Sequence, residues 1–223
     1  MTIFRNPRTL RVAARQLAEA MHSDCCPADR AFDQFLPERL SVVSPFYWSP
    51  LAVAQRAAEW FTDAGVHTVV DIGSGAGKFC VAAALFGGCR FMGLEQRPFL
   101  VQSARALARL FDVNDRVRFV DGALGTVPTP IAEAYYFFNP FGNYSFGVER
   151  LTNMGDECSE ARRAHDVAAA EQLLRRAAVG TWVLTFNGFG GRIPEGYDLA
   201  RVDWELPAAL RMWKKTRWRP SNG

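Results

Sequence analysis

A run of closely spaced glycines behind an acidic residue is the part of this sequence best suited to holding a ligand. The segment 69–77 reads VVDIGSGAG, with Asp71 inside an apolar run and Gly73, Gly75 and Gly77 at every second position after it. Glycine tolerates positive φ and lets bare backbone approach a ligand. The first N–H groups of a following helix attract a carboxylate or phosphate. The segment therefore predicts a strand, a tight turn and a helix around an anionic or nucleotide-like ligand.

Two better-known glycine loops do not fit this segment. The dinucleotide-binding pattern places its third glycine where this chain has Lys78. The triphosphate-binding loop needs a serine or threonine after its lysine, where Phe79 stands, and a first glycine where Ile72 stands. Residue identity excludes both patterns. For the loop taken alone, a tight turn without any ligand remains an open alternative.

Two further predicted strands end in acidic residues. The apolar run 89–94 is followed by Glu95, about 20 residues beyond the glycines, where an acidic residue meets ribose hydroxyls in nucleoside-binding α/β folds. A carboxylate suits that task because it accepts hydrogen bonds from two neighbouring hydroxyls. The run 116–120 ends in Asp121 and Gly122. Each acid alone is typical of a solvated strand end, whereas three at successive strand ends indicate one binding edge.

Taken together, these strand ends resemble motif I and the following acidic positions of the class I S-adenosylmethionine (SAM) dependent methyltransferases. The resemblance covers residues 46–187 and points to no particular subfamily. It implies that the glycine loop holds SAM, that Glu95 binds the ribose, and that Asp121 and the next backbone N–H bind the adenine. The cofactor-binding residues that it implies are Asp71, Gly73, Ser74, Gly75, Gly77, Glu95, Gln96, Asp121, Gly122, Asn139 and Tyr47.

The predicted strand 133–138 runs into Asn139, Pro140 and Phe141, which carry the catalytic prediction. Ligands of open α/β sheets lie beyond the carboxyl ends of the strands. This turn resembles the Asn-Pro-Pro-Tyr/Phe motif of amino-group methyltransferases with one proline missing, and it is similar to the asparagine-aromatic turn of histone-lysine methylases. The resemblance implies that Asn139 orients an acceptor nitrogen and that Phe141 and Tyr144 wall its pocket. An Asn-Pro pair that only punctuates a turn is the alternative.

Aromatic residues ahead of the glycine loop predict a lid. Residues 46–48 read FYW, and their rings could stabilise the sulfonium of SAM by cation–π contact. A hydrophobic anchor for the N-terminal part of the chain is the alternative. The following pattern predicts a helix over 51–64, with Ser49 as N-cap and Pro50 at the first helical position. Gly65 is expected to end this helix.

The order of the predicted elements defines the fold class. Strands are expected over 68–72, 89–94, 116–120, 133–138 and 180–186, and helices over 76–87, 98–111 and 157–178. Such alternation predicts parallel βαβ units. Two more strands are expected in 197–205 and 208–218, the second antiparallel. We therefore expect an α/β fold, a Rossmann-like seven-stranded, mostly parallel sheet with flanking helices.

The N-terminal part of the chain differs in pattern from the rest. Helices are expected over 8–20 and 28–40, followed by a loop over 41–50. We expect residues 1–50 to form an N-terminal helical cap with the aromatic lid, and residues 51–223 to form the SAM-binding methyltransferase domain.

Composition limits the class of protein and its partners. The chain has 223 residues, 49% hydrophobic side chains and a net charge of +3, which is typical of a globular protein and does not by itself argue for nucleic acid. Basic and aromatic residues alternate over 211–219. Nucleic acid or protein is therefore a candidate partner through this segment, with a solvated edge strand as the alternative. No apolar run is long enough to span a membrane and no secretory signal is present, so we expect no membrane partner.

The cysteines favour a reducing compartment. There are five, an odd number, and Cys80 and Cys89 fall within predicted elements as buried free thiols, so a cytoplasmic location is expected. His22 with Cys25 and Cys26 could begin a metal site, but no second cluster completes a tetrahedral set. We therefore predict no metal.

The favoured function is transfer of a methyl group from SAM to an amino nitrogen of an unidentified acceptor, which could be protein lysine, nucleic acid or a small molecule. This chemistry mainly requires positioning and the exclusion of water, so it fits a sequence without a compact His/Cys/Asp catalytic cluster. A noncatalytic SAM-binding or partner-binding module is one alternative. An aminopropyl-transferring relative is another, and it would carry aspartates where Asn139 stands.

Overall fold

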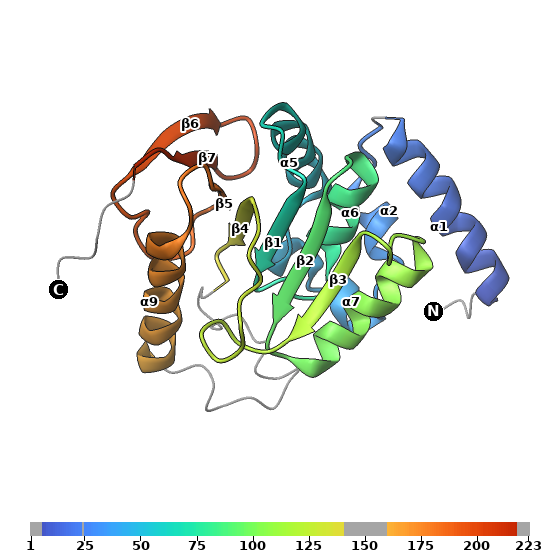
Figure 1. Cartoon of the computed structure of the whole chain (residues 1–223). Helices are drawn as coiled ribbons and strands as arrows, with labels where there is room; N and C mark the ends of the chain where they lie inside the picture. Colours follow the sequence, from blue (N-terminus) through green and yellow to red (C-terminus); the bar gives the residue numbers. More distant parts are fainter. Residues whose placement is uncertain (1–5, 24, 141–159, 218–223) are drawn as a thin grey trace.

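The architecture is a seven-stranded, mostly parallel sheet with helices on both faces (Figure 1). The computed structural model describes residues 6–23, 25–140 and 160–217. The strand order is β3-β2-β1-β4-β5-β7-β6. The strands are β1 (Thr68–Ile72), β2 (Arg90–Glu95), β3 (Val117–Asp121), β4 (Ala134–Phe138), β5 (Trp182–Phe186), β6 (Tyr197–Asp203) and β7 (Leu210–Lys215). This order confirms the predicted Rossmann-like α/β fold.

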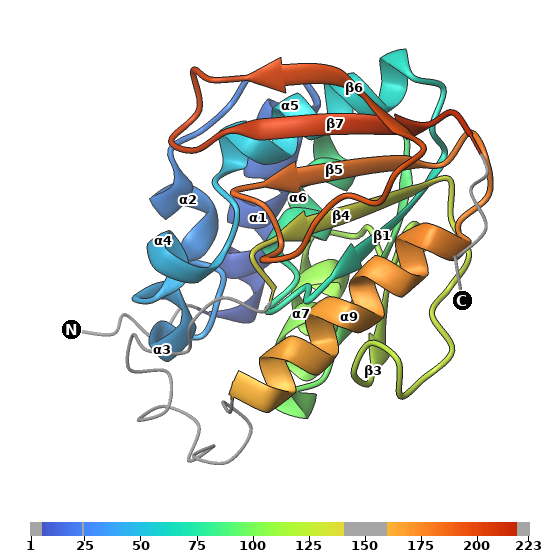
Figure 2. The ribbon, with the colours of Figure 1, turned by 90° about the vertical axis from the view of Figure 1, so that its left-hand side faces the viewer.

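The antiparallel strand lies where the sequence predicts it. β7 pairs with β5 on one side and β6 on the other, and both pairings are antiparallel. In Figure 2 the arrows of β5 and β6 accordingly point one way and that of β7 the other. The remaining pairs, β3 with β2, β2 with β1, β1 with β4 and β4 with β5, are parallel. The carboxyl ends of five parallel strands therefore lie along one edge of the sheet.

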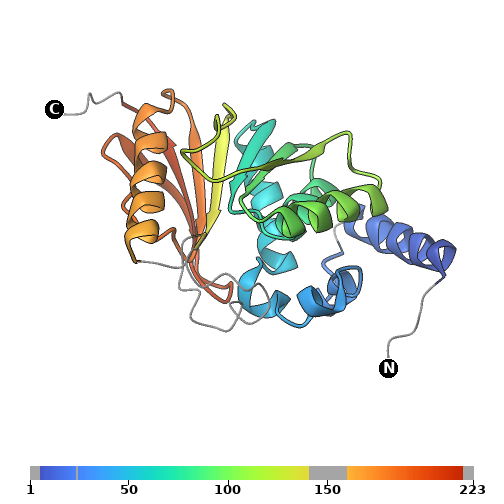
Figure 3. The same ribbon diagram turned by 90° about the horizontal axis from the view of Figure 1, so that it is seen from below.

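Helices cover both faces of this sheet. The helices are α1 (Pro7–His22), α2 (Asp29–Asp33), α3 (Glu38–Ser41), α4 (Ser44–Tyr47), α5 (Leu51–Asp63), α6 (Lys78–Phe86), α7 (Pro98–Leu110) and α9 (Glu160–Arg176). Seen from below, the orange helix α9 lies on one face, and α5, α7 and the blue N-terminal helices lie on the other (Figure 3). The central strands are buried on both faces, so β1 and β4 show continuous burial rather than alternation, and Asp71 is buried within β1.

The N-terminal helices pack into the same hydrophobic cluster as α5, α6 and α7. Ala14 and Met21 of α1 and Phe32 of α2 are fully buried in that cluster. Phe32 stacks on Phe111 at the end of α7, with ring centroids 4.9 Å apart. The region between α1 and α5 differs from the prediction, because 28–40 is split into α2 and α3 around Pro37 and the expected loop contains α4. Proline disfavours helical backbone in the residue before it, which explains the break.

The start of α5 corrects one prediction and its end confirms another. Pro50, not Ser49, is the N-cap residue, and the backbone N–H of Leu51 donates to a carboxylate oxygen of Asp29 at 3.0 Å. The prediction of Ser49 as N-cap was wrong because a carboxylate from α2 takes over that role, and Pro50, predicted at the first helical position, lies one residue before it. At the other end, Gly65 has a φ of +68° and donates to the Thr62 carbonyl, as expected of a terminating glycine.

The basic C-terminal strand points its side chains in different directions. Lys215 is buried, and its ammonium group donates to the carbonyls of Leu174, Arg175 and Ala177 at the end of α9. Lys214 lies over the Trp182 ring, with 4.9 Å from Nζ to the ring centroid. Lys214 and Lys215 therefore face opposite sides of the strand, and the Lys215 charge is used inside the protein. Binding of nucleic acid or protein by 211–219 stays a prediction, and residues 218 and 219 lie outside the described residues.

The described part of the chain contains no helix long and apolar enough to cross a membrane. Within the same residues, no cluster of three or more histidine, cysteine, aspartate or glutamate side chains is suited to a metal ion. Cys80 and Cys89 are buried free thiols, as predicted, whereas Cys25 and Cys26 are exposed.

Candidate functional site

The glycine loop joins β1 to α6 at the carboxyl edge of the sheet. The loop glycines adopt positive φ values, which residues with a side chain rarely do: +78° at Gly73, +56° at Gly75 and +80° at Gly77. A Cβ on Gly73 would lie 2.6 Å from the Pro140 Cβ, and a Cβ on Gly75 would overlap the indole nitrogen of Trp48. The loop is therefore enclosed on two sides by other segments, and both positions require glycine for conformation and for space.

Glu95 at the end of β2 binds this loop directly. One carboxylate oxygen accepts from the backbone N–H of Gly75 at 2.9 Å, and the other accepts from the backbone N–H of Arg97, also at 2.9 Å. Burial raises the pKa of the Glu95 carboxyl, while Arg97 and the backbone donors act in the opposite direction. Two predicted cofactor residues, 20 positions apart in the sequence, are thus brought into contact.

Asp71 is also buried, but it faces a helix rather than the open edge. Its carboxylate accepts from the Cys80 thiol of α6 at 3.3 Å. Burial raises the pKa of Asp71 to about 7, the Cys80 hydrogen bond lowers it, and the nearby Glu95 charge raises it further. The sequence did not indicate that Cys80 would be the partner of Asp71, because that contact depends on how α6 packs on β1.

Ser74 supplies an unsatisfied polar atom within the loop. Its hydroxyl is buried and has no hydrogen-bond partner among the described residues. The side chain occupies the space left by Gly93 of β2, where a Cβ would lie 2.5 Å from the Ser74 oxygen. Buried hydroxyls without a partner are uncommon. This one fits a site that is completed by a polar ligand.

The other predicted cofactor residues follow along the same edge. Asp121 ends β3 directly beside Glu95 in the strand pairing, and its side chain is exposed. The backbone N–H of Gly122 donates to the Glu95 carbonyl at 3.0 Å. The side-chain oxygen of Gln96 accepts from Arg162 of α9 at 3.1 Å. Glu95 and Asp121 therefore lie side by side at the ends of β2 and β3, whereas Asp71 pairs with Gly93 and lies inside β1, so only two of the three acids are in the predicted register.

The predicted catalytic turn begins at the end of β4. Asn139 is exposed, has a φ of +38°, and donates its backbone N–H to the Gly188 carbonyl at 2.8 Å. Pro140 packs against Gly73, so the turn lies next to the glycine loop. Phe141 and Tyr144 lie outside the described residues.

A second asparagine, Asn187, occupies the same position on the neighbouring strand. Phe138 and Phe186 are the last paired residues of β4 and β5, so Asn139 and Asn187 are the first residues beyond the two strand ends. Asn187 is exposed and has a φ of +56°. Non-glycine residues held at positive φ are uncommon and gather at functional sites. The repeated order of strand, Phe and Asn was the sequence signal that could have indicated Asn187.

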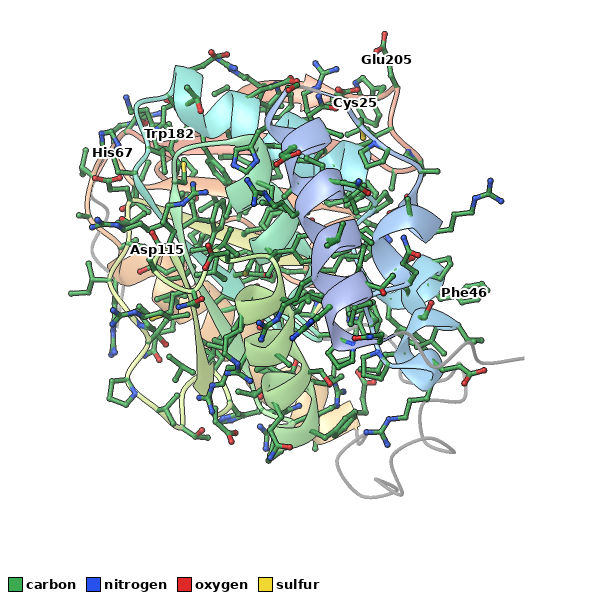
Figure 4. All side chains as sticks on the ribbon, turned by 90° about the vertical axis from the view of Figure 1, so that its right-hand side faces the viewer. Cys25, Phe46, His67, Asp115, Trp182 and Glu205 are labelled. Carbon is green, nitrogen blue, oxygen red and sulfur yellow. The ribbon has the colours of Figure 1, made fainter. Side chains whose placement is uncertain are left out.

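The aromatic segment approaches the loop through Trp48. Tyr47, the residue predicted to contact the cofactor, is half-buried, and Phe46 is 76% exposed and projects outward (Figure 4). The indole of Trp48 lies against Gly75. Next to it, the hydroxyls of Ser49 and Tyr136 are hydrogen-bonded at 2.6 Å, and the Tyr136 ring stacks on Phe79. A lid role for Tyr47 stays a prediction, whereas the contact with the glycine loop is made by Trp48.

Comparison with known proteins identifies the fold. No protein-family model and no curated protein matches the sequence. An RNA methyltransferase from Salinibacter ruber, solved with S-adenosyl-L-homocysteine (SAH), has a TM-score of 0.54 and 22% identity and covers 78% of this chain and 97% of its own. An O-methyltransferase from Bacillus cereus, also solved with SAH, has a TM-score of 0.57 and 12% identity, over 92% and 100%. TrmN from Thermus thermophilus has a TM-score of 0.51 and 17% identity, over 75% and 49%.

These similarities establish the fold of the class I SAM-dependent methyltransferases, without a subfamily. The strand order and the antiparallel β7 agree with that class. At these identities the likeness concerns the fold, so the role of each residue rests on the geometry of the loop and of the strand ends.

Proposed function

We propose that this chain is a SAM-dependent methyltransferase. The observation that carries the proposal is the contact between Gly75 and Glu95, 2.9 Å from backbone nitrogen to carboxylate oxygen, in a loop with three glycines at positive φ. The fold that carries this contact is similar to that of proteins solved with SAH, the product of SAM. The buried, unpartnered hydroxyl of Ser74 supports a polar ligand at the same loop.

We assign each part of SAM to residues at a different strand end. The loop of Gly73, Gly75 and Gly77 presents bare backbone to the methionine part. Glu95, whose carboxylate already orders the loop, accepts from the ribose hydroxyls. Asp121, which ends the adjacent strand, is the proposed partner of the adenine amino group. The backbone N–H of Gly122, which the sequence predicted to bind an adenine ring nitrogen, donates instead to the Glu95 carbonyl. Asp71, which precedes the loop, accepts from Cys80 of α6 and so joins β1 to the helix that follows the loop.

The proposed transfer depends on positioning. SAM supplies a methyl group that is already activated by a positive sulfur, and a neutral thioether leaves. The protein therefore has to align the acceptor and exclude water. The exposed Asn139 at the end of β4, next to the glycine loop through Pro140, has a carboxamide oxygen suited to accept from an N–H donor. We propose an amino nitrogen as the acceptor atom on that ground.

The acceptor class stays open between protein, nucleic acid and small molecules. One similar structure is an RNA methyltransferase and another an O-methyltransferase, so the similar folds support methyl transfer without selecting an acceptor. Incubation with SAM that carries a labelled methyl group, together with a fractionated lysate, tests both points. We expect the label to enter one fraction and SAH to accumulate. SAH that binds without any turnover would support a noncatalytic SAM-binding module instead.

A further inference from the structure

A buried lysine follows the glycine loop directly. Lys78 is the first residue of α6, and its side chain is 1% exposed. Its ammonium group contacts Asp29 at 2.6 Å, Asp33 at 2.8 Å and the hydroxyl of Ser44 at 3.1 Å. Ser44 in turn donates to Asp33 at 2.7 Å. All three ammonium protons therefore have an oxygen partner, and every partner comes from the N-terminal part of the chain.

These contacts hold the beginning of the segment 44–49, which we call the strap. Ser44 is fully buried at the first position of the strap, and Ser49 is buried at the last. Ser49 bonds to the hydroxyl of Tyr136 on β4 at 2.6 Å. The strap is thus fixed at both ends by buried hydroxyls. Between those ends, Trp48 lies against Gly75.

We propose that Lys78 is a positioning residue of the cofactor site, which acts through Ser44 and the strap to hold Trp48 on the glycine loop. This inference rests on the proposed function, because it assigns to the strap one wall of the SAM site. Lys78 itself does not contact the cofactor. It contributes to cofactor binding indirectly, because it helps to orient the indole of Trp48.

Fold stability alone is a poor explanation of this network. Replacing a buried ion pair by well-packed apolar side chains is often neutral or stabilising, so a lysine between two aspartates is not needed to fill the space. A cation with three fixed oxygen partners does specify one arrangement of the segments that carry them. Here those segments are α2 and the strap on one side and the glycine loop on the other.

The first test needs no ligand. Ser44→Ala removes the hydroxyl that joins Lys78 to the strap, and Ser23→Ala, which removes an exposed hydroxyl bonded to the Glu19 carbonyl, is the matched control. The signal of Trp48 is the difference in fluorescence between each variant and the same variant with Trp48→Phe. We expect acrylamide to quench Trp48 at least about twofold more strongly in Ser44→Ala and no more strongly in Ser23→Ala. Unchanged quenching in Ser44→Ala would overturn the proposal.

The second test asks whether the effect passes through Trp48. The dissociation constant of SAH is measured by calorimetry for the wild type, Ser44→Ala, Trp48→Ala and the double variant. We expect Ser44→Ala to raise the dissociation constant of SAH about tenfold when Trp48 is present. When Trp48 has been replaced by alanine, the same substitution should raise it less than about twofold. The same factor in both backgrounds would contradict the proposal. If the wild type binds no SAH, the proposed function fails, while the quenching test still decides how the strap is held.

Discussion

Asp71 shows how burial, rather than charge pairing, sets the chemistry of an individual residue in this protein. Its carboxyl is buried two residues before the glycine loop, with the thiol of Cys80 as its hydrogen-bond donor. Because no cation balances it in the contacts that the structure describes, burial raises the pKa of Asp71 to about 7. A carboxyl that resists ionisation makes the stability of the fold depend on pH in the direction opposite to that of a salt-bridged aspartate.

The Asp71 carboxyl should cost stability as the pH rises. The pKa of this carboxyl is about 3.9 in the unfolded chain and about 7 in the folded protein, so the folded protein holds the proton more tightly. The resulting contribution to the free energy of unfolding is fully present below about pH 4 and is lost as the pH rises through about 7. Asp71→Asn can still accept from Cys80 but does not ionise. We expect the free energy of unfolding of Asp71→Asn, relative to the wild type, to rise by about 3 kcal/mol between pH 5 and pH 8. Urea unfolding at both pH values measures it, and a pH-independent difference would contradict the raised pKa.

Two residues at positive φ, Asn139 and Asp112, permit a test that separates backbone strain from the chemistry of the Asn139 side chain. Asn139→Gly relieves the positive φ and removes the carboxamide. We expect an unchanged dissociation constant for SAH and a kcat about 10- to 100-fold lower, because the acceptor is no longer aligned. Asp112→Gly, at the third non-glycine position of positive φ within the described residues, is the control and should retain activity. Equal losses in both variants would argue against a role for the Asn139 side chain.

At the level of elements, the last strand and the last helix stabilise each other through one side chain. Lys215 of β7 donates to three carbonyls at the carboxyl end of α9, where helix carbonyls lack partners within the helix and a cation interacts favourably with the dipole. This contact accounts for one of the basic residues that made 211–219 look like a binding segment.

Lys215→Met should therefore loosen α9. The variant leaves one buried and two partly buried carbonyl groups without their donor, so we expect a loss of about 2 kcal/mol in the free energy of unfolding. Lys214→Met, whose side chain lies over Trp182 at the surface, should cost less than about 1 kcal/mol. Urea unfolding of both variants checks this difference, and equal losses would contradict the capping role.

The secondary structure could be predicted from the sequence where local pattern decides it. Apolar runs give β1 and β4, and Gly65 marks the end of α5. The errors fall where partners come from far along the chain. Ser49 has the sequence position of an N-cap, but it bonds to Tyr136, while Asp29 receives the N–H of Leu51. Neither contact has a signature in the surrounding residues.

The whole molecule shows which parts of a site can be foreseen. The binding edge follows from topology, because acids at the ends of successive parallel strands must lie side by side. The prediction therefore placed Glu95 and Asp121 side by side, as the structure has them, whereas Asp71 lies deeper in β1 and contacts Cys80 of α6. The sequence predicted an aromatic lid over 46–48 but neither the hold of Lys78 on the strap nor the position of Asn187, because these depend on how the N-terminal helices and β5 pack on that edge. Identifying them required three-dimensional contacts.

Binding of SAH to the intact chain tests the central claim most directly. Calorimetry is done with the wild type, with Gly75→Arg, whose side chain would collide with Trp48, and with Gly88→Arg, whose position has open space and no positive φ. All three should show the same far-ultraviolet circular dichroism. The account predicts that the wild type and Gly88→Arg bind one SAH per chain with equal affinity and that Gly75→Arg binds none. A folded wild type that does not bind SAH, or equal binding by Gly75→Arg, would contradict it.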